Sequence, residues 1–269
     1  MGHRQIDTAV ILAAGIGKRL RPLTNSKPKC LVNVAGRPIL CHMLDALDER
    51  NFQRVIVVTG YREEAVRNFL QVSPSGPAVE LINNDLYDKT NNIYSLRLAA
   101  DAIGSDDFLL LESDLVFDPG LLDPLIVPDR IALAPYLPEI HNGTTAIVND
   151  HGELVGLNVK GDSGTGGGTS TQQKLYKTVN ITSFSNSVWE IIFNLMEEMI
   201  ENGDLQQFYE VAIARTLEQD AITLRMVDFS CQWWDEIDNL TDLERVRQAI
   251  LKGITPLSEQ LRRIQVDDP

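Results

Sequence analysis

A glycine-rich segment that directly follows a short apolar run constrains the fold of this 269-residue chain more than any other feature. Residues 8–14 read TAVILAA, which is too short for a core helix and is typical of a buried strand. The run leads into Gly15, Ile16 and Gly17, where small residues let the backbone approach a ligand and direct N–H groups at phosphate oxygens. A strand followed by such a loop predicts an anion-binding turn in an α/β fold.

Cationic side chains gather immediately after these glycines. Five of them lie between positions 18 and 29: Lys18, Arg19, Arg21, Lys27 and Lys29. The whole chain has 38 acidic against 24 basic residues, so this cluster is a local anion site, and the overall charge argues against nucleic acid as a partner. Leu20 stands where a dinucleotide fingerprint needs its third glycine, and no Ser or Thr follows Lys18 as in a Walker A loop, so neither common phosphate loop fits.

Apolar periodicity predicts strands and helices that alternate through the first half of the chain. Strands are expected over residues 8–14, 54–59, 79–83 and 107–112, and helices over residues 39–50, 62–70 and 95–103. This order predicts an α/β fold with a Rossmann-like, mostly parallel central sheet and helices on both faces.

The second half of the chain predicts a smaller, β-rich part. Strands are expected over residues 130–135, 144–148, 154–159, 179–184 and 231–238, and helices over residues 187–201, 208–217 and 241–251. Residues 161–173 are small and polar, which is typical of a loop outside the core. We expect one domain over residues 7–254, followed by a polar C-terminal tail or linker over residues 255–269.

Cysteine usage and the absence of long apolar runs indicate the compartment. Cys30, Cys41 and Cys231 form no CxxC spacing, which is typical of reduced thiols without a zinc site or a disulfide framework. The chain shows neither a signal-peptide pattern nor an apolar run long enough to span a bilayer. We therefore expect a cytoplasmic protein without a membrane partner.

The segment around the glycines also carries a resemblance to a known superfamily. Residues 12–38 fill every position of the pattern LAAGxGxRLxPxTxxxPKxLxxVxGxP. This string resembles the nucleotidyltransferase superfamily of sugar-phosphate nucleotidylyltransferases and their cytidylyltransferase relatives. The resemblance implies a Mg²⁺-dependent enzyme that moves a nucleoside monophosphate from an NTP to a small phosphate-bearing acceptor, with the β-rich part binding that acceptor.

The resemblance also implies roles for particular residues. Arg19 would stabilise the triphosphate, and Lys29 would hold the α-phosphate or the acceptor phosphate, so both are candidate catalytic residues. The implied nucleotide-binding residues are Leu12, Ala13, Ala14, Gly15, Gly17, Lys18, Arg19, Asn83, Asn91 and Ser113.

Carboxylates at two places in the chain are candidate metal ligands. Asp114 follows the strand expected over residues 107–112, and ligands bind at the carboxyl ends of parallel strands. Residues 233–238 read WWDEID, and strand alternation directs Glu236 and Asp238 to one face and Asp235 to the other. The matching segment of the superfamily supplies a second ligand, usually its final Asp. We therefore expect Asp114 and Asp238 to hold Mg²⁺, with help from Glu236.

Two further strings point to the acceptor. Residues 89–96, KTNNIYSL, resemble the phosphocholine cytidylyltransferase branch, and Asn142 and residues 177–181 resemble cytidylyltransferases that activate phosphonates such as 2-aminoethylphosphonate. This resemblance implies that Asn92, Asn142 and Lys177 bind the acceptor. Lys177 would face its phosphonate group and is the third candidate catalytic residue. The alternative for Lys177 is a surface lysine.

These observations favour a CTP:phosphonate (or phosphoalcohol) cytidylyltransferase. The anionic acceptor would attack the α-phosphorus in line, without a protein nucleophile. Aromatic residues make up 6% of the chain, few for the aromatic cage that choline prefers, so a phosphonate is favoured over phosphocholine.

Three alternatives stay open: a sugar-1-phosphate nucleotidylyltransferase using UTP or dTTP, a phosphocholine cytidylyltransferase, and an inactive regulatory module on the same fold. Small molecules are the expected partners, with no nucleic acid and no membrane. A homodimer and a fusion to a second enzymatic domain also stay open.

Overall fold

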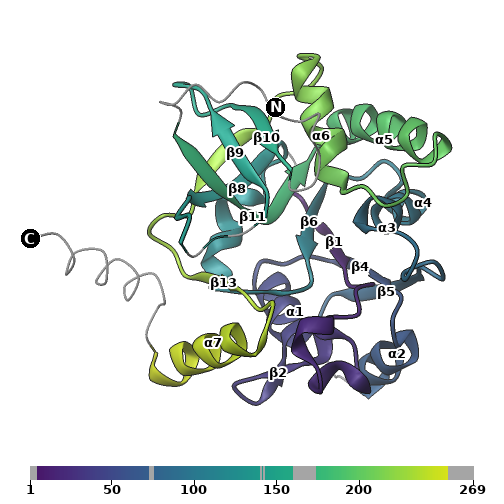
Figure 1. Ribbon diagram of the computed structural model, residues 1–269, viewed down its shortest axis with the longest axis vertical. Coiled ribbons are helices and arrows are strands. Elements are labelled where there is room, and N and C mark those ends of the chain that lie inside the picture. Colours follow the sequence, from purple (N-terminus) through teal and green to yellow (C-terminus); the bar gives the residue numbers. More distant parts are fainter. Residues whose placement is uncertain (1–4, 73–75, 140, 142, 160–173, 254–269) are drawn as a thin grey trace, which may run out of the picture.

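A computed structural model describes residues 5–72, 76–139, 141, 143–159 and 174–253 (Figure 1). Asn142, residues 161–173 and the tail 255–269, each the subject of an expectation above, lie outside this set.

Four parallel strands form the centre of the sheet. β1 (Thr8–Leu12) pairs on one side with β4 (Arg54–Thr59) and on the other with β6 (Phe108–Glu112), and β4 pairs with β5 (Ala78–Asn83). Every residue of β1 is buried, because helices cover both faces of the sheet. This accounts for the uninterrupted apolar run at residues 8–14.

Mixed strands extend this sheet into the β-rich part. β11 (Leu175–Phe184) lies antiparallel to β6 and to β8 (Arg130–Pro135), and β12 (Arg225–Asp228) adds to β8 in parallel. β9 (Thr145–Val148) pairs with the start of β11, and β10 (Leu154–Asn158) pairs with β9. The described residues thus form a nine-stranded sheet whose centre is parallel, as the sequence predicted.

An irregularity in β11 separates the two parts of the sheet. The register with β8 shifts between Thr178 and Thr182, and Asn180 between them has a φ of 61°. The first residues of β11 therefore pair with β9, while its last residues pair with β6. The expected strand at residues 179–184 is correct for the second half only, because the bulge hides the continuation to Leu175.

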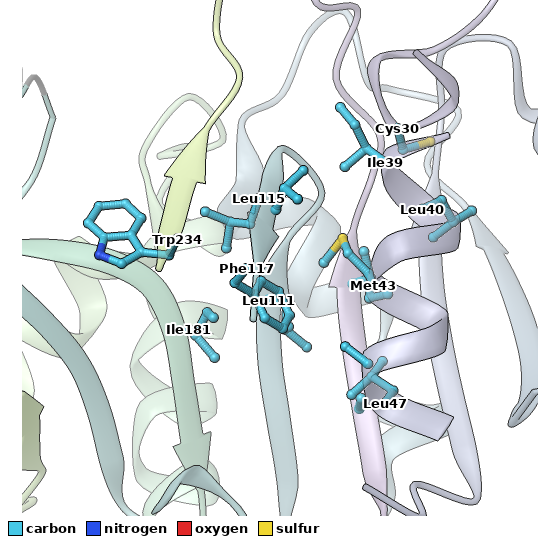
Figure 2. Packing of buried hydrophobic residues seen from close by; sticks show 14 of the residues in the cluster. Cys30, Ile39, Leu40, Met43, Leu47, Leu111, Leu115, Phe117, Ile181 and Trp234 are labelled. Atoms are coloured by element: carbon cyan, nitrogen blue, oxygen red, sulfur yellow. The ribbon is translucent and has the colours of Figure 1, made fainter. Parts of the chain in front are cut away.

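Helices cover both faces of the sheet, so two apolar clusters form. Ala9 and Ile11 face one cluster, and Val10 and Leu12 face the other, as strand alternation requires. The first cluster includes side chains of α1 (Ile39–Glu49), α2 (Glu63–Val72) and α7 (Leu240–Lys252), and the second those of α3 (Asn92–Leu98), α4 (Ala100–Ile103), α5 (Asn186–Glu201) and α6 (Tyr209–Glu218). Figure 2 shows the α1 side of this packing. None of the described helices has the length and apolarity to cross a bilayer.

Short elements connect these layers. The segment after β1 forms three 3-10 turns and a two-stranded hairpin: η1 (Lys18–Leu20), η2 (Leu23–Asn25), η3 (Lys29–Leu31), β2 (Asn33–Val34) and β3 (Arg37–Pro38). After β6 come β7 (Leu115–Phe117) and η4 (Pro119–Leu125). The strand expected over residues 231–238 is only β13 (Trp234–Glu236), which pairs with β7 outside the main sheet.

Two neighbouring isoleucines on α5 test the packing of the second cluster. Ile192 is 1% exposed and Ile191 is 39% exposed. We expect Ile192→Ala to lower the free energy of unfolding by about 2–4 kcal/mol, because it leaves a cavity, and Ile191→Ala to change it by about 0.5 kcal/mol or less. Urea unfolding followed by circular dichroism measures both values; equal losses would contradict the placement of α5.

Candidate active site

A cavity of about 390 Å³ lies at the carboxyl ends of β1 and β6. Ligand sites of open α/β sheets lie at this edge. Many of the residues singled out from the sequence line it: Leu12, Ala14, Gly15, Arg19, Asn91, Asn92, Asp114, Lys177, Glu236 and Asp238. The fold thus brings segments from both halves of the chain to one cavity.

Other expected site residues lie beside the cavity or away from it. Ala13 and Ser113 are buried, and their N–H groups donate to Val58 O and Leu12 O, so they hold the strand ends together. Lys18 is exposed on η1. Asn83 lies at the exposed end of β5, where its side chain donates to Asp85, and does not line the cavity.

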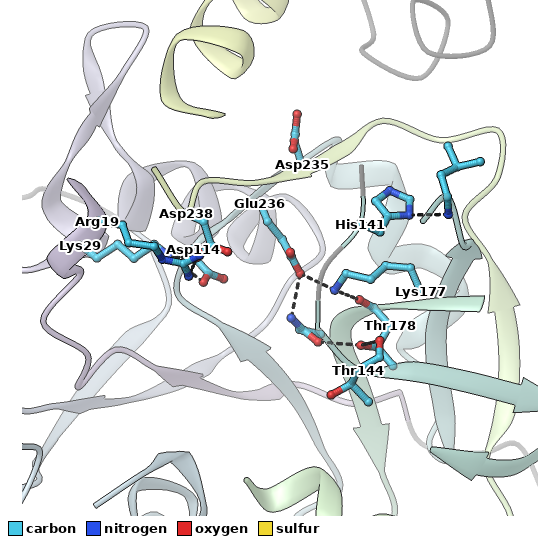
Figure 3. A network of polar contacts seen from close by, with 12 residues as sticks. Arg19, Lys29, Asp114, His141, Thr144, Lys177, Thr178, Asp235, Glu236 and Asp238 are labelled. Atoms are coloured by element: carbon cyan, nitrogen blue, oxygen red, sulfur yellow. Dashed lines mark hydrogen bonds and ion pairs between the residues drawn. The ribbon is translucent and has the colours of Figure 1, made fainter. Parts of the chain in front are cut away.

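Lys29 joins the two carboxylates that were expected to hold a metal (Figure 3). Its Nζ donates to Asp114 Oδ2 at 2.8 Å and to Asp238 Oδ1 at 2.9 Å. Arg19 approaches the same oxygen of Asp238 at 2.7 Å. Burial lowers the pKa of Lys29, but the charges and hydrogen bonds of Asp114 and Asp238 outweigh burial and raise it. Lys29 is therefore held as an ammonium group.

The backbone places these three side chains together. Gly17 has a φ of +66°, and a Cβ on it would lie 3.0 Å from the Cβ of Lys29. Glycine is thus required for the turn and for the close approach of Lys29. On the other side, the N–H of Ile237 donates to the carbonyl of Asp114 at 2.9 Å, which fixes Asp238 beside Asp114.

The arrangement of Asp114 and Asp238 fits a divalent cation. Asp114 Oδ1 is buried and has no hydrogen-bond partner, and Asp114 Oδ2 and Asp238 Oδ1 already face one cationic nitrogen. Carboxylate oxygens are ligands that Mg²⁺ prefers, with phosphate oxygens and water completing the shell. Within the described ranges no three His, Cys, Asp or Glu side chains converge on one point, so the protein offers two carboxylates there.

Glu236 instead belongs to a second network with Lys177. Lys177 is 2% exposed, which rules out its interpretation as a surface lysine, and its Nζ donates to Glu236 Oε1 at 2.9 Å. Asn180 donates to the same oxygen at 2.9 Å. Burial raises the pKa of Glu236 to about 7, with the charge of Asp114 adding to the effect and the ammonium of Lys177 opposing it.

The sequence did not predict a pair of acids, the half-buried Glu112 and the buried Glu210, which also line the cavity. Asn92 Nδ2 donates to Glu112 Oε1 at 3.0 Å and to Glu210 Oε2 at 3.4 Å. Burial raises the pKa of Glu112 well above its usual range, with Asp114 and Glu210 adding to the shift, and burial also raises the pKa of Glu210. Neither carboxylate forms an ion pair with a described residue. The sequence offered one signal for Glu210, because this charged residue lies among the apolar residues at the start of α6.

Comparisons with known proteins show what this chain is similar to. Residues 9–129 match the MobA-like NTP transferase domain. The chain is 32% identical to the CMP-5'-(3-aminopropyl)phosphonate synthase of Streptomyces rubellomurinus over 94% of its own length, but spans only 40% of that relative. It is 28% identical to the 2-aminoethylphosphonate cytidylyltransferase of Lancefieldella rimae, over 87% of this chain and 89% of the relative.

Solved structures share the fold. A CTP:phosphocholine cytidylyltransferase from Streptococcus pneumoniae superimposes with a TM-score of 0.76 at 19% identity, over 92% of this chain and all of that one (100%). The inositol-1-phosphate CTP transferase of T. maritima gives a TM-score of 0.72 at 18% identity, over 93% of this chain and 98% of that one. The resemblance predicted from residues 12–38 is confirmed: the matching domain and both relatives are nucleotidyltransferases.

The raised pKa of Glu210 predicts that replacing this acid by a neutral residue stabilises the fold. A raised pKa means that the folded chain binds a proton more tightly than the unfolded chain, so the charged form of Glu210 destabilises the fold as pH rises above about 4.5, the ordinary glutamate pKa. We expect Glu210→Gln to raise the Tm at pH 7.5 by about 2–4 °C, which is ~1 kcal/mol for a chain of this size. The gain should disappear near pH 4, where both states are protonated.

The matched control is Glu218→Gln at the exposed end of the same helix, which should leave the Tm unchanged. Thermal scans from pH 4 to pH 8 test both variants. A lower Tm for Glu210→Gln at pH 7.5 would show that the Glu210 carboxylate stabilises the ligand-free fold.

Proposed function

We propose that this nucleotidyltransferase transfers CMP from CTP to an amino-terminated phosphonate and releases pyrophosphate. The proposal rests on the charged side chains of one cavity, where cations and acids form two separate groups. Arg19 and Lys177 line it as cations beside Lys29, and Glu112 and Glu210 line it as a carboxylate pair without a cationic partner among the described residues. A small acceptor with a negative and a positive end complements both groups.

The nucleotide would occupy the end formed by the loop after β1. Leu12, Ala14 and Gly15 line this end and have no long side chains to fill it. Arg19 reaches it from η1 with a side chain that is 65% exposed, so it is free to turn from Asp238 to a triphosphate. CTP is favoured over other nucleotides because the two relatives above are named for CMP or cytidylyl transfer.

Asp114 and Asp238 would hold Mg²⁺, the expected cofactor, which supplies positive charge at the α-phosphate and the leaving pyrophosphate. Lys29 lies between these carboxylates. A cation held by them would replace Lys29 as their counter-ion and would leave its ammonium group available to a phosphate oxygen.

The reaction needs no covalent enzyme intermediate. An anionic oxygen of the phosphonate attacks the α-phosphorus and forms a new P–O bond, while the bond from the α-phosphorus to the bridging oxygen breaks and its electron pair leaves with pyrophosphate. Lys177, held by Glu236, faces the phosphonate, and Arg19 and Lys29 neutralise the phosphates. Positioning and charge neutralisation therefore account for catalysis.

The acceptor's ammonium group would bind between Glu112 and Glu210. Its N–H groups would donate to both carboxylates, and its charge would offset the burial and mutual repulsion of the pair. Asn92 holds one oxygen of each acid, and the N–H of Tyr209 donates to Asn92 Oδ1 at 2.9 Å, so the pair is fixed before the acceptor arrives.

The same features disfavour the alternative acceptors. A sugar phosphate has no cationic group for the acid pair. A quaternary ammonium lacks the N–H donors that would satisfy two carboxylates and prefers aromatic faces. Among the described residues that line the cavity, Tyr87 and Phe208 are the aromatic ones.

Pyrophosphate release across CTP, UTP, ATP and GTP tests the proposal directly. The matched acceptors are 2-aminoethylphosphonate and ethylphosphonate, which differ in the amino group. We expect turnover with CTP and an advantage of about 100-fold or more in kcat/KM for the amino compound, because without the amino group Glu112 and Glu210 stay without a cationic partner. Turnover confined to UTP and a sugar phosphate would overturn the proposal.

The exchange of Lys29 for a divalent cation has its own test. In Lys29→Met the two carboxylates lose their shared cation, so about 10 mM MgCl₂ should raise the Tm of the variant by about 2–4 °C more than that of the unsubstituted chain. Lys18→Met, at an exposed lysine of the same loop, should respond like the unsubstituted chain. Equal responses of all three would contradict a metal site between Asp114 and Asp238.

A further inference from the structure

Arg245 on α7 forms ion pairs with Asp235 and Asp242, which lie on either side of the segment that carries Glu236 and Asp238. Its Nε and Nη2 donate to the two carboxylate oxygens of Asp235 at 2.8 and 2.6 Å. Its Nη1 donates to Asp242 Oδ1 at 2.8 Å. A two-point guanidinium–carboxylate contact fixes orientation as well as distance, so Arg245 ties β13 to the first turn of α7.

Asp242 links Arg245 to the backbone of Asp238 through hydrogen bonds. Its second oxygen, Oδ2, accepts the N–H groups of Asp238 at 3.0 Å and of Asn239 at 3.1 Å. Asn239 in turn caps α7 by accepting from the N–H groups of Thr241 and Asp242. Two hydrogen bonds in sequence therefore connect the guanidinium of Arg245 to the backbone of Asp238.

Asp235 fixes the other flank of the segment. It is 8% exposed, and burial raises its pKa while Arg245 opposes the shift. In Figure 3 Asp235 points away from Glu236 and Asp238, as strand alternation requires. Asp235 and Asp242 are therefore both held by one guanidinium, and Glu236 and Asp238 project toward the cavity from the segment between them.

We propose that Arg245 is a positioning residue that sets the position of Asp238 relative to Asp114 and so controls the affinity for the divalent cation. The inference rests on the proposed function in one respect, namely that these two carboxylates ligate the metal. Mg²⁺ tolerates little deviation from octahedral geometry, so a small displacement of Asp238 weakens binding. Residues that orient metal ligands from behind typically change metal affinity 10–100-fold.

The test uses Mn²⁺ as the probe, with its dissociation constant measured by electron paramagnetic resonance in the presence of an unreactive CTP analogue. We expect R245M to weaken Mn²⁺ binding about tenfold or more. R245K should be intermediate, because lysine keeps the charge but cannot form the two-point contact; it also serves as the test variant if R245M does not fold.

Two controls on α7 separate positioning from general stability. Arg247 pairs with Glu244 at an exposed site, so R247M should leave the Mn²⁺ dissociation constant unchanged. Val246 is fully buried, so V246A should lower the Tm without weakening Mn²⁺ binding.

The outcomes distinguish this inference from the proposed function. If the unsubstituted chain binds Mn²⁺ and R245M and R245K bind it equally well, the positioning role is overturned while the metal site stands. If V246A weakens Mn²⁺ binding as much as R245M does, the effect belongs to stability and the inference also fails. If the unsubstituted chain binds no Mn²⁺, both the metal assignment and the inference fall, whereas the pyrophosphate assay still decides the transfer reaction.

Discussion

The candidate site depends on one ammonium group held between two carboxylates. Lys29 reaches Asp114 across 85 residues of sequence and Asp238 across 209, so it joins the loop after β1, the end of β6 and the end of β13. Burial alone would favour the neutral form of Lys29, and the two acids reverse that preference. Burial likewise raises the pKa of Asp238, but Lys29 and Arg19 outweigh it and the pKa is lowered. Lys29 and Asp238 are thus both held in their charged forms, and the contacts of Lys29 with Asp114 and Asp238 connect the three segments.

The same cavity also contains two acids that form no ion pair with a described residue. Glu112 and Glu210 have Asn92 as their shared hydrogen-bond donor, and burial raises the pKa of both. Buried acids of this kind destabilise a protein unless a ligand compensates them, and functional sites are where such costs persist. Carboxylates of Asp114, Asp238 and Glu236 already pair with Lys29 and Lys177. No described side chain forms an ion pair with Glu112 or Glu210. This asymmetry is what favours an acceptor with a cationic end.

Much of the fold could be predicted from periodicity, because the parallel strands are buried on both faces. The strands expected at residues 54–59 and 130–135 have the bounds of β4 and β8. The superfamily resemblance likewise assigned Asp114 and Asp238 to one candidate metal site, and the structure places both beside Lys29. The acid pair was missed because no motif assigned a role to Glu112 or Glu210. The bulge at Asn180 was missed because a single residue with positive φ leaves no periodic signal. The hydrogen bonds of Arg245 to Asp235 and Asp242 depend on how α7 packs against the rest of the fold. No local sequence pattern predicts this packing.

The decisive measurement is a crystal structure of the chain with the CMP-linked aminophosphonate product and Mg²⁺. We expect the ammonium nitrogen of the product to lie within hydrogen-bond distance of both Glu112 and Glu210. We also expect Asp114 and Asp238 to ligate the cation and Lys29 to contact a phosphate oxygen. A product whose ammonium group faces solvent, with Lys29 still between Asp114 and Asp238, would contradict both expectations.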